Sequence, residues 1–238
     1  MLTIILLYYY NSKKLNHLLY LITFALWYRI GCGKPRLKNI NKKDIFHPKH
    51  LMAMVLMALG VKIVVNFGMD MIPKQFLENY VNMIKRTGIG DSLLPTIAAT
   101  LVAPIGEELI FRGVVFYYLR NAVADMPNKT AAFWITNVFQ AFLFGVFHGN
   151  IVQGAYAFIF GLILGYLAYR FKSILPSILG HMIINNSNFV MGHVKKIIPT
   201  DSVSDVVVVV IALAVIAVGY IIAGRVPENT VVKKETVT

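Results

Sequence analysis

The chain has 238 residues, of which 57% are hydrophobic and only 14% charged, and its mean hydropathy is +0.65. Because a soluble domain usually carries about a quarter charged residues, this composition excludes a disordered chain, a collagen, a coiled coil and a disulfide scaffold. The single cysteine, Cys32, cannot form an internal disulfide. The net charge of +12 collects in loops between apolar blocks, which indicates membrane topology and anionic lipid headgroups rather than nucleic acid.

The apolar blocks predict an all-α, polytopic transmembrane bundle of about seven or eight helices. A helix needs about 20 apolar residues to cross the hydrocarbon core of a bilayer. At the N-terminus, 2–10 is too short to cross and 15–30 is marginal, so this region is expected to hold one or two segments. Six further spans are predicted: Leu51–Gly68, Leu93–Leu119, Ala131–Phe147, Ile151–Tyr169, Ile174–Gly192 and Val206–Ala223.

Basic residues in the loops predict the orientation of the bundle. The loop 29–49 contains seven basic residues and one acid, Asp44, so we expect it to face the cytoplasm. Alternation along the chain then places the loops 120–130 and 170–173, and the C-terminal tail, on the same side. The lysine pair at 195–196 falls on the opposite side.

Glu107 and Glu108 are the only two of the eleven acidic residues that lie well inside a predicted span. An ionised side chain at bilayer depth costs a few kcal/mol, so its presence requires a function or a partner. On a helix Glu108 and Arg112 are four residues apart and share a face, so we expect them to pair. Glu107 is rotated about 100° away and has no such partner in its own helix. The pattern predicts one structural glutamate and one that is available for chemistry.

Two of the six histidines are associated with other polar residues of the spans. His148 closes one span, His181 lies inside another, and Asn185 follows His181 by four residues, so the last two can face one cavity. The other histidines are expected at the membrane interface; they are His17, His47, His50 and His193. Two histidines, an unpaired glutamate and an asparagine on three spans are difficult to explain by packing alone.

Three short motifs on separate spans are Glu107-Glu108-x-x-x-Arg112, Phe144-x-x-x-His148 and His181-x-x-x-Asn185. In this order they resemble the motifs of the CPBP (Abi) family of intramembrane proteases, which includes CAAX prenyl endopeptidases and bacteriocin-processing or self-immunity proteins. The resemblance implies a helical catalytic core at 93–192. One integral membrane domain would then consist of N-terminal segments with a basic loop (1–92), this core, and a final helix with a basic tail (193–238).

Peptide hydrolysis needs an activated water and a donor to the developing oxyanion. Glu107 can accept the proton of the water, and His148 can hold or polarise it. By resemblance to the prenyl endopeptidases, His181 and Asn185 would donate hydrogen bonds to the oxyanion. The residues expected to support the site are Glu108, Arg112 and Phe144. Serine or cysteine catalysis is not expected, since Cys32 is remote from the motifs and no serine has an obvious base.

A metal mechanism stays open beside this one. In residue type, Glu107, His148 and His181 match a catalytic zinc ligand set with an open fourth position, and some members of the family are called metalloproteases. The familiar H-E-x-x-H motif is absent, so zinc cannot be inferred from spacing. We therefore commit to no cofactor and prefer a directly activated water.

Two functions of other classes compete with proteolysis. One is a small proton-coupled transporter, in which we would expect acidic and basic groups on most spans. The other is a non-catalytic immunity protein or membrane scaffold that binds a bacteriocin or its receptor. For the protease, the expected partners are a peptide or membrane-anchored protein substrate and the lipid bilayer. The chain is rich in Asn, Lys and Ile, which indicates a low-GC bacterium and a multi-pass protein of its cell membrane.

Overall fold

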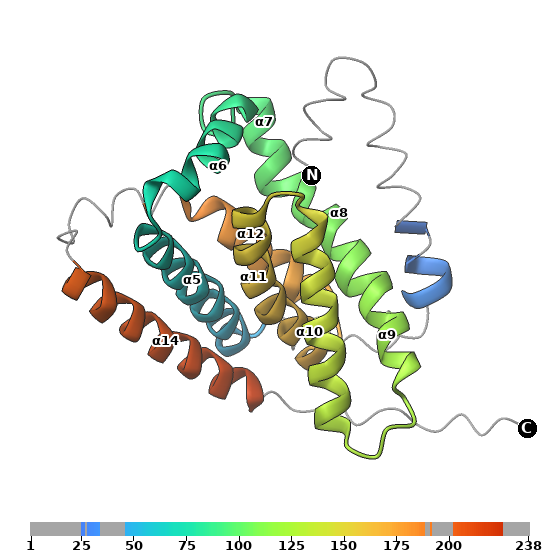
Figure 1. Cartoon of the computed structure of the whole chain (residues 1–238). Helices are drawn as coiled ribbons and strands as arrows, with labels where there is room; N and C mark the ends of the chain where they lie inside the picture. The colour runs from blue at the N-terminus through green and yellow to red at the C-terminus, as the bar shows by residue number, and fades with distance from the viewer. Residues whose placement is uncertain (1–24, 27, 34–45, 189–190, 192–201, 226–238) are drawn as a thin grey trace, which may run out of the picture.

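A computed structural model describes residues 25–26, 28–33, 46–188, 191 and 202–225 (Figure 1). These residues are helical apart from short turns and loops, and none of them forms a β-strand. The predicted all-α fold class is confirmed. The expected N-terminal segment at 2–10, and most of the one at 15–30, lie outside the described residues; η1, a π-helix, covers Tyr28–Gly33.

Five helical stretches in the described part of the chain are long and apolar enough to cross a membrane, which confirms a polytopic membrane protein. They coincide with five of the predicted spans to within a few residues at each end. The stretches are α5 (Pro48–Asp70), Leu93–Ala122, α10 (Lys129–Phe147), α11 (Ile151–Arg170) and most of α14 (Ser202–Gly224). A short helix outside these spans, α6 (Lys74–Thr87), connects the first two.

The stretch Leu93–Ala122 alternates between α-helical and π-helical winding. Its parts are α7 (Leu93–Ile97), η2 (Ala98–Val102), α8 (Ala103–Glu108), η3 (Leu109–Val115) and α9 (Phe116–Ala122). A π-helical turn inserts a residue relative to α-helix and changes the direction of the side chains that follow; such turns are frequent at functional sites. The two glutamates end α8, and Arg112 lies within η3.

The sixth predicted span, Ile174–Gly192, contains α12 (Leu175–Asn186), which is shorter than expected. Twelve helical residues rise only about 18 Å, less than the roughly 30 Å of the hydrocarbon core. The amide of Asn186 donates to Met182 O (2.8 Å) and the hydroxyl of Ser187 donates to Ile184 O (2.9 Å). Such local side-chain bonds compete with continuation of a helix. Half of the residues that would complete the predicted span, 189, 190 and 192, lie outside the described ones.

Small residues bring neighbouring helices into close contact. α5 and α14 run antiparallel, side by side, with Gly60 against Ala212 and Ile216 (Figure 1). α10 and α11 touch at Gly145 and Gly154, where a Cβ on Gly145 would lie 2.6 Å from the Gly154 carbonyl oxygen. A larger residue at 145 would therefore separate two helices that frame the polar centre of the bundle.

Candidate active site

Glu108 is the centre of a buried polar network that joins the first and third motifs. Its Oε1 accepts hydrogen bonds from Arg112 Nη1 and His181 Nδ1, each at 2.8 Å, and its Oε2 accepts one from Ser177 Oγ. All four side chains are buried. The predicted Glu108–Arg112 pair is present, and it is also connected to α12 through Ser177 and His181.

Arg112 connects the network to α10 and α11. Its Nη2 donates to Gly161 O at 3.2 Å, and its guanidinium lies 4.4 Å from the centroid of the Phe144 ring. A buried charge is tolerated only when partners replace the lost water, and here the carboxylate of Glu108, a carbonyl and an aromatic face replace it. Removing one partner would leave the others as uncompensated buried groups.

Glu107 is buried beside this network and contacts it through the His181 ring. Its Oε2 lies 3.7 Å from His181 Nε2, beyond direct hydrogen-bond length. Because a carboxylate only accepts, Nδ1 of His181 carries the hydrogen in its bond to Glu108. His181 thus has one ring nitrogen bound to Glu108 and the other directed toward Glu107.

His148 is the C-cap residue of α10 and is also buried. Its Nδ1 lies 2.8 Å from Phe144 O, and since a carbonyl only accepts, Nδ1 donates and the Nε2 of a neutral ring keeps a lone pair. The edge-on contacts of Phe144 with His148 and His181 have centroid separations of 4.8 and 5.8 Å. Phe144 therefore brings the second motif against the third.

Asn185 lies one turn after His181, and its Nδ2 donates to Ala99 O at 2.9 Å. Its neighbour Asn186 donates to Thr100 O at 3.3 Å. Pro104 explains why Ala99 O can accept the bond from Asn185. The amide of Ala103 donates to Ala98 O, five residues back, so residue 104 would donate to Ala99 O, and proline has no amide hydrogen. The two asparagines thus attach the end of α12 to η2.

Sequence reasoning missed several buried polar residues of this network. Ser177 was detectable, because it precedes His181 by four residues and so shares its helical face. Gln140 and Asn137 on α10 are also among them: Gln140 Nε2 donates to Gly161 O and to Asn137 Oδ1, both at 2.9 Å. Their spacing of three residues on one face was the available signal.

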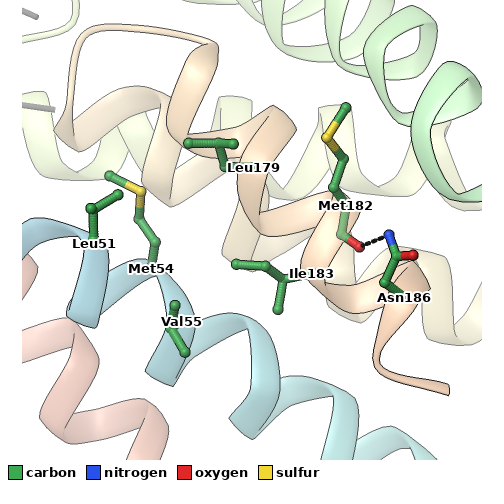
Figure 2. A pocket seen from close by; sticks show the side chains of 7 residues that line it. All are labelled: Leu51, Met54, Val55, Leu179, Met182, Ile183 and Asn186. Carbon is green, nitrogen blue, oxygen red and sulfur yellow. Dashed lines mark hydrogen bonds between the residues drawn. The ribbon is translucent and has the colours of Figure 1, made fainter. Parts of the chain in front are cut away.

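An apolar cavity of about 270 Å³ lies between α5 and α12 (Figure 2). Leu179 and Ile183, which line it, are each two residues from His181 and hence project from the opposite face of α12. The cavity is therefore separate from the polar network. Its other lining residues are Leu51, Met54, Val55, Met182 and Asn186.

Within the described residues, no group of three or more His, Cys, Asp or Glu side chains is placed to hold a metal ion. The predicted ligand set of Glu107, His148 and His181 does not converge in this way. The donors as arranged do not fit a three-ligand zinc site, so we derive no catalytic step through a metal.

Residues 89–187 match the family model described as Type II CAAX prenyl endopeptidase Rce1-like. All three motifs lie inside this segment, and the resemblance to the CPBP (Abi) family is confirmed. The match covers less than half of the chain, and it shows that this segment is similar to type II CAAX prenyl endopeptidases. No curated protein and no solved structure matches the chain.

Proposed function

We propose that this chain with an Rce1-like segment is an intramembrane endopeptidase that cleaves a membrane-associated or precursor peptide by means of a water activated by Glu107. The observation that carries the proposal is the 3.7 Å separation of Glu107 Oε2 from His181 Nε2 in a buried site. Two polar atoms at this spacing make no direct hydrogen bond, so a small third group such as water can bind to both.

In the proposed reaction, Glu107 takes a proton from the water while the lone pair of His148 Nε2 orients it. The resulting hydroxide attacks the carbonyl carbon of the peptide and forms a tetrahedral oxyanion. Glu107 then returns the proton to the leaving nitrogen as the C–N bond breaks. One carboxylate thus serves as base and then as acid, and no net proton is consumed.

We assign the oxyanion donors to His181 and Asn185. Because Nδ1 of His181 already donates to Glu108, Nε2 can donate only when the ring is doubly protonated. Glu108, itself paired with Arg112, orients the His181 ring through this hydrogen bond. An asparagine amide has two N–H groups, so the bond from Asn185 to Ala99 O leaves a second one for the oxyanion.

The substrate we propose is a peptide or a membrane-anchored precursor in a bacterial cell membrane, with bacteriocin processing or self-immunity as the biological setting. The test is quantitative mass spectrometry of peptide termini in membranes of cells that express the wild type, Glu107→Ala or His148→Ala. Glu78→Ala, on α6 outside the spans, is the matched control. We expect protein-dependent termini to vanish in the first two variants and to persist in the control, at equal membrane abundance.

Persistence of all termini in Glu107→Ala would refute water activation by this residue. If no terminus depends on the wild-type protein, a non-catalytic immunity protein or scaffold becomes the better explanation. Activity of a thoroughly chelated preparation distinguishes the two chemistries that the sequence left open: retained cleavage supports the directly activated water, and loss that zinc restores supports a metal.

A further inference from the structure

Gln153, in the first turn of α11, is a buried polar residue that the proposed reaction does not use. Its side chain is only 7% exposed, and its Oε1 has no hydrogen-bond partner among the described residues. Leaving a buried acceptor unpaired costs free energy, so such a group in a folded protein requires an explanation. A ligand that donates a hydrogen bond to Oε1 provides one.

The connection from α10 to α11 places Gln153 at the same end of these helices as His148. His148 is the C-cap of α10, and Gly149, with φ +66°, has the left-handed conformation in which a helix commonly ends. α11 begins two residues later. Gly154, next to Gln153 in sequence, lies in close contact with Gly145 of α10. The start of α11 is therefore held against the helix that carries the second motif.

The Gln153 side chain lies on the face of α11 that is directed at the motifs. Ala157, one turn later on this face, packs in a buried cluster with Phe144 of the second motif. Tyr156 also packs against this cluster, and its hydroxyl interacts electrostatically with the Glu107 carboxylate. The first two turns of α11 thus contribute polar side chains beside the two residues to which we assign the activation of water.

Other polar side chains nearby have partners, in contrast to Gln153. The hydroxyl of Tyr156 lies 3.3 Å from that of Tyr80 on α6. Gln140 also has an unpaired Oε1, but its Nε2 makes two hydrogen bonds, one of them to α11, and these fix its amide within the network. Among the described residues, no side-chain bond of this kind fixes the amide of Gln153.

A peptide segment opened for cleavage has the groups that a glutamine amide binds. In a helix the backbone N–H and C=O groups are satisfied internally, so a segment that is unwound inside a membrane protein needs new partners for them. A glutamine amide presents one acceptor oxygen beside a nitrogen with two N–H donors. It can therefore accept from the N–H and donate to the C=O of one residue in an extended peptide, whatever the side chain of that residue.

We propose that Gln153 binds the main chain of the substrate peptide in an extended conformation, with Oε1 accepting a backbone N–H beside the reacting water. This inference rests on the proposed function and adds to it a subsite that recognises the peptide backbone rather than a particular sequence. Gln153 would contribute to the binding of the peptide, whereas Glu107 would act in the chemical step.

The experiment compares the binding of two fluorescent pools of apolar decapeptides of random sequence to the full chain in detergent micelles. One pool has ordinary amides and the other is N-methylated at every backbone nitrogen, which removes the donors and keeps the apolar side chains. All samples carry Glu107→Gln, so that the peptides stay intact. We expect the ordinary pool to bind about tenfold more tightly, and Gln153→Met to lose most of this preference.

Gln75→Met is the matched control, because Gln75 is an exposed glutamine of α6, and it should keep the full preference. Comparison between variants cancels any difference in the partition of the two pools into micelles. An unchanged preference in Gln153→Met would overturn the proposal, and so would the absence of a preference when Gln153 is present.

Thermal unfolding distinguishes peptide binding from a structural role. Because the Oε1 of Gln153 has no partner among the described residues, Gln153→Met should unfold at the same temperature as the parent protein or above it. Gln140→Met, which removes two hydrogen bonds, should unfold at a lower temperature. An equal fall in both variants would overturn the proposal. Since binding is measured without hydrolysis, an error in the proposed reaction would leave these expectations unchanged and would be detected separately in the membrane peptide termini.

Discussion

Adjacent glutamates in one helix have different surroundings in this protein. Glu108 accepts hydrogen bonds from Arg112, Ser177 and His181, so both of its oxygens are occupied. Glu107 is also buried, yet its Oε2 lies 3.7 Å from His181 Nε2, beyond hydrogen-bond length. Helix geometry predicts one structural and one chemically available carboxylate, and we propose that Glu108 has the first role and Glu107 the second.

Arg112→Ala should destabilise the protein because it leaves the buried carboxylate of Glu108 without its charge partner. Breaking a buried pair in this way typically costs about 3–5 kcal/mol. Glu108→Gln/Arg112→Gln should be milder, since no orphan charge remains. Thermal unfolding of the purified variants checks the order. If Arg112→Ala is fully stable and merely inactive, Arg112 acts on the substrate and the pairing argument is wrong.

Asn185→Ala and Asn186→Ala are matched variants that distinguish a role in holding the end of α12 against η2 from a role in catalysis. Each variant loses a side-chain bond to η2, so each should lose about 0.5–1.5 kcal/mol of stability. Only Asn185→Ala should also lower kcat, by about 10²–10³-fold, with little change in KM. Steady-state kinetics and unfolding on the same samples provide the measurement. Equal loss of kcat in both variants would reduce Asn185 to a purely structural residue.

At the level of elements, the irregular winding of the helix Leu93–Ala122 determines where the first motif meets α12. In the π-helical winding here the amide of residue 104 would donate to Ala99 O. Pro104 has no such amide, and Asn185 of α12 donates to Ala99 O instead, next to the bond from Asn186 to Thr100 O. The proline therefore couples one helix to another through hydrogen bonds that the sequence pattern alone does not reveal.

Pro104→Ala should weaken this coupling without destabilising the helix itself. The new amide can bond within its own helix, which removes the roughly 3 kcal/mol cost of an interior proline while it competes with Asn185 for the carbonyl acceptor. We expect turnover to fall while thermal stability is unchanged or higher. In a double-mutant cycle with Asn185→Ala the two losses of turnover should be less than additive. Full additivity would show that the proline acts independently of Asn185.

For the whole molecule, hydropathy sufficed to predict the helical class and five spans, and i,i+4 spacing sufficed to predict the Glu108–Arg112 pair, because both are local properties of the sequence. The limit of α12 at Asn186 was not predictable from apolar content, since it coincides with side-chain bonds between neighbouring turns. Ser177, Gln140 and the asparagine contacts with η2 depend on which helices touch. Tertiary contacts of this kind are not encoded in the composition of any one span.

Close packing of α10 on α11 should therefore affect the site from a distance, and Gly145→Ala tests this. The added methyl would lie 2.6 Å from the carbonyl oxygen of Gly154, so the helices must separate, at a cost of about 1–3 kcal/mol. His148, three residues further on, would move with α10, so proteolysis should fall together with thermal stability. Gly68→Ala on α5 is the control, because a methyl there meets nothing within 4 Å and alanine is the better helix former. Wild-type stability and cleavage in Gly145→Ala would mean that the bundle can absorb the separation, and that the position of His148 does not depend on this contact.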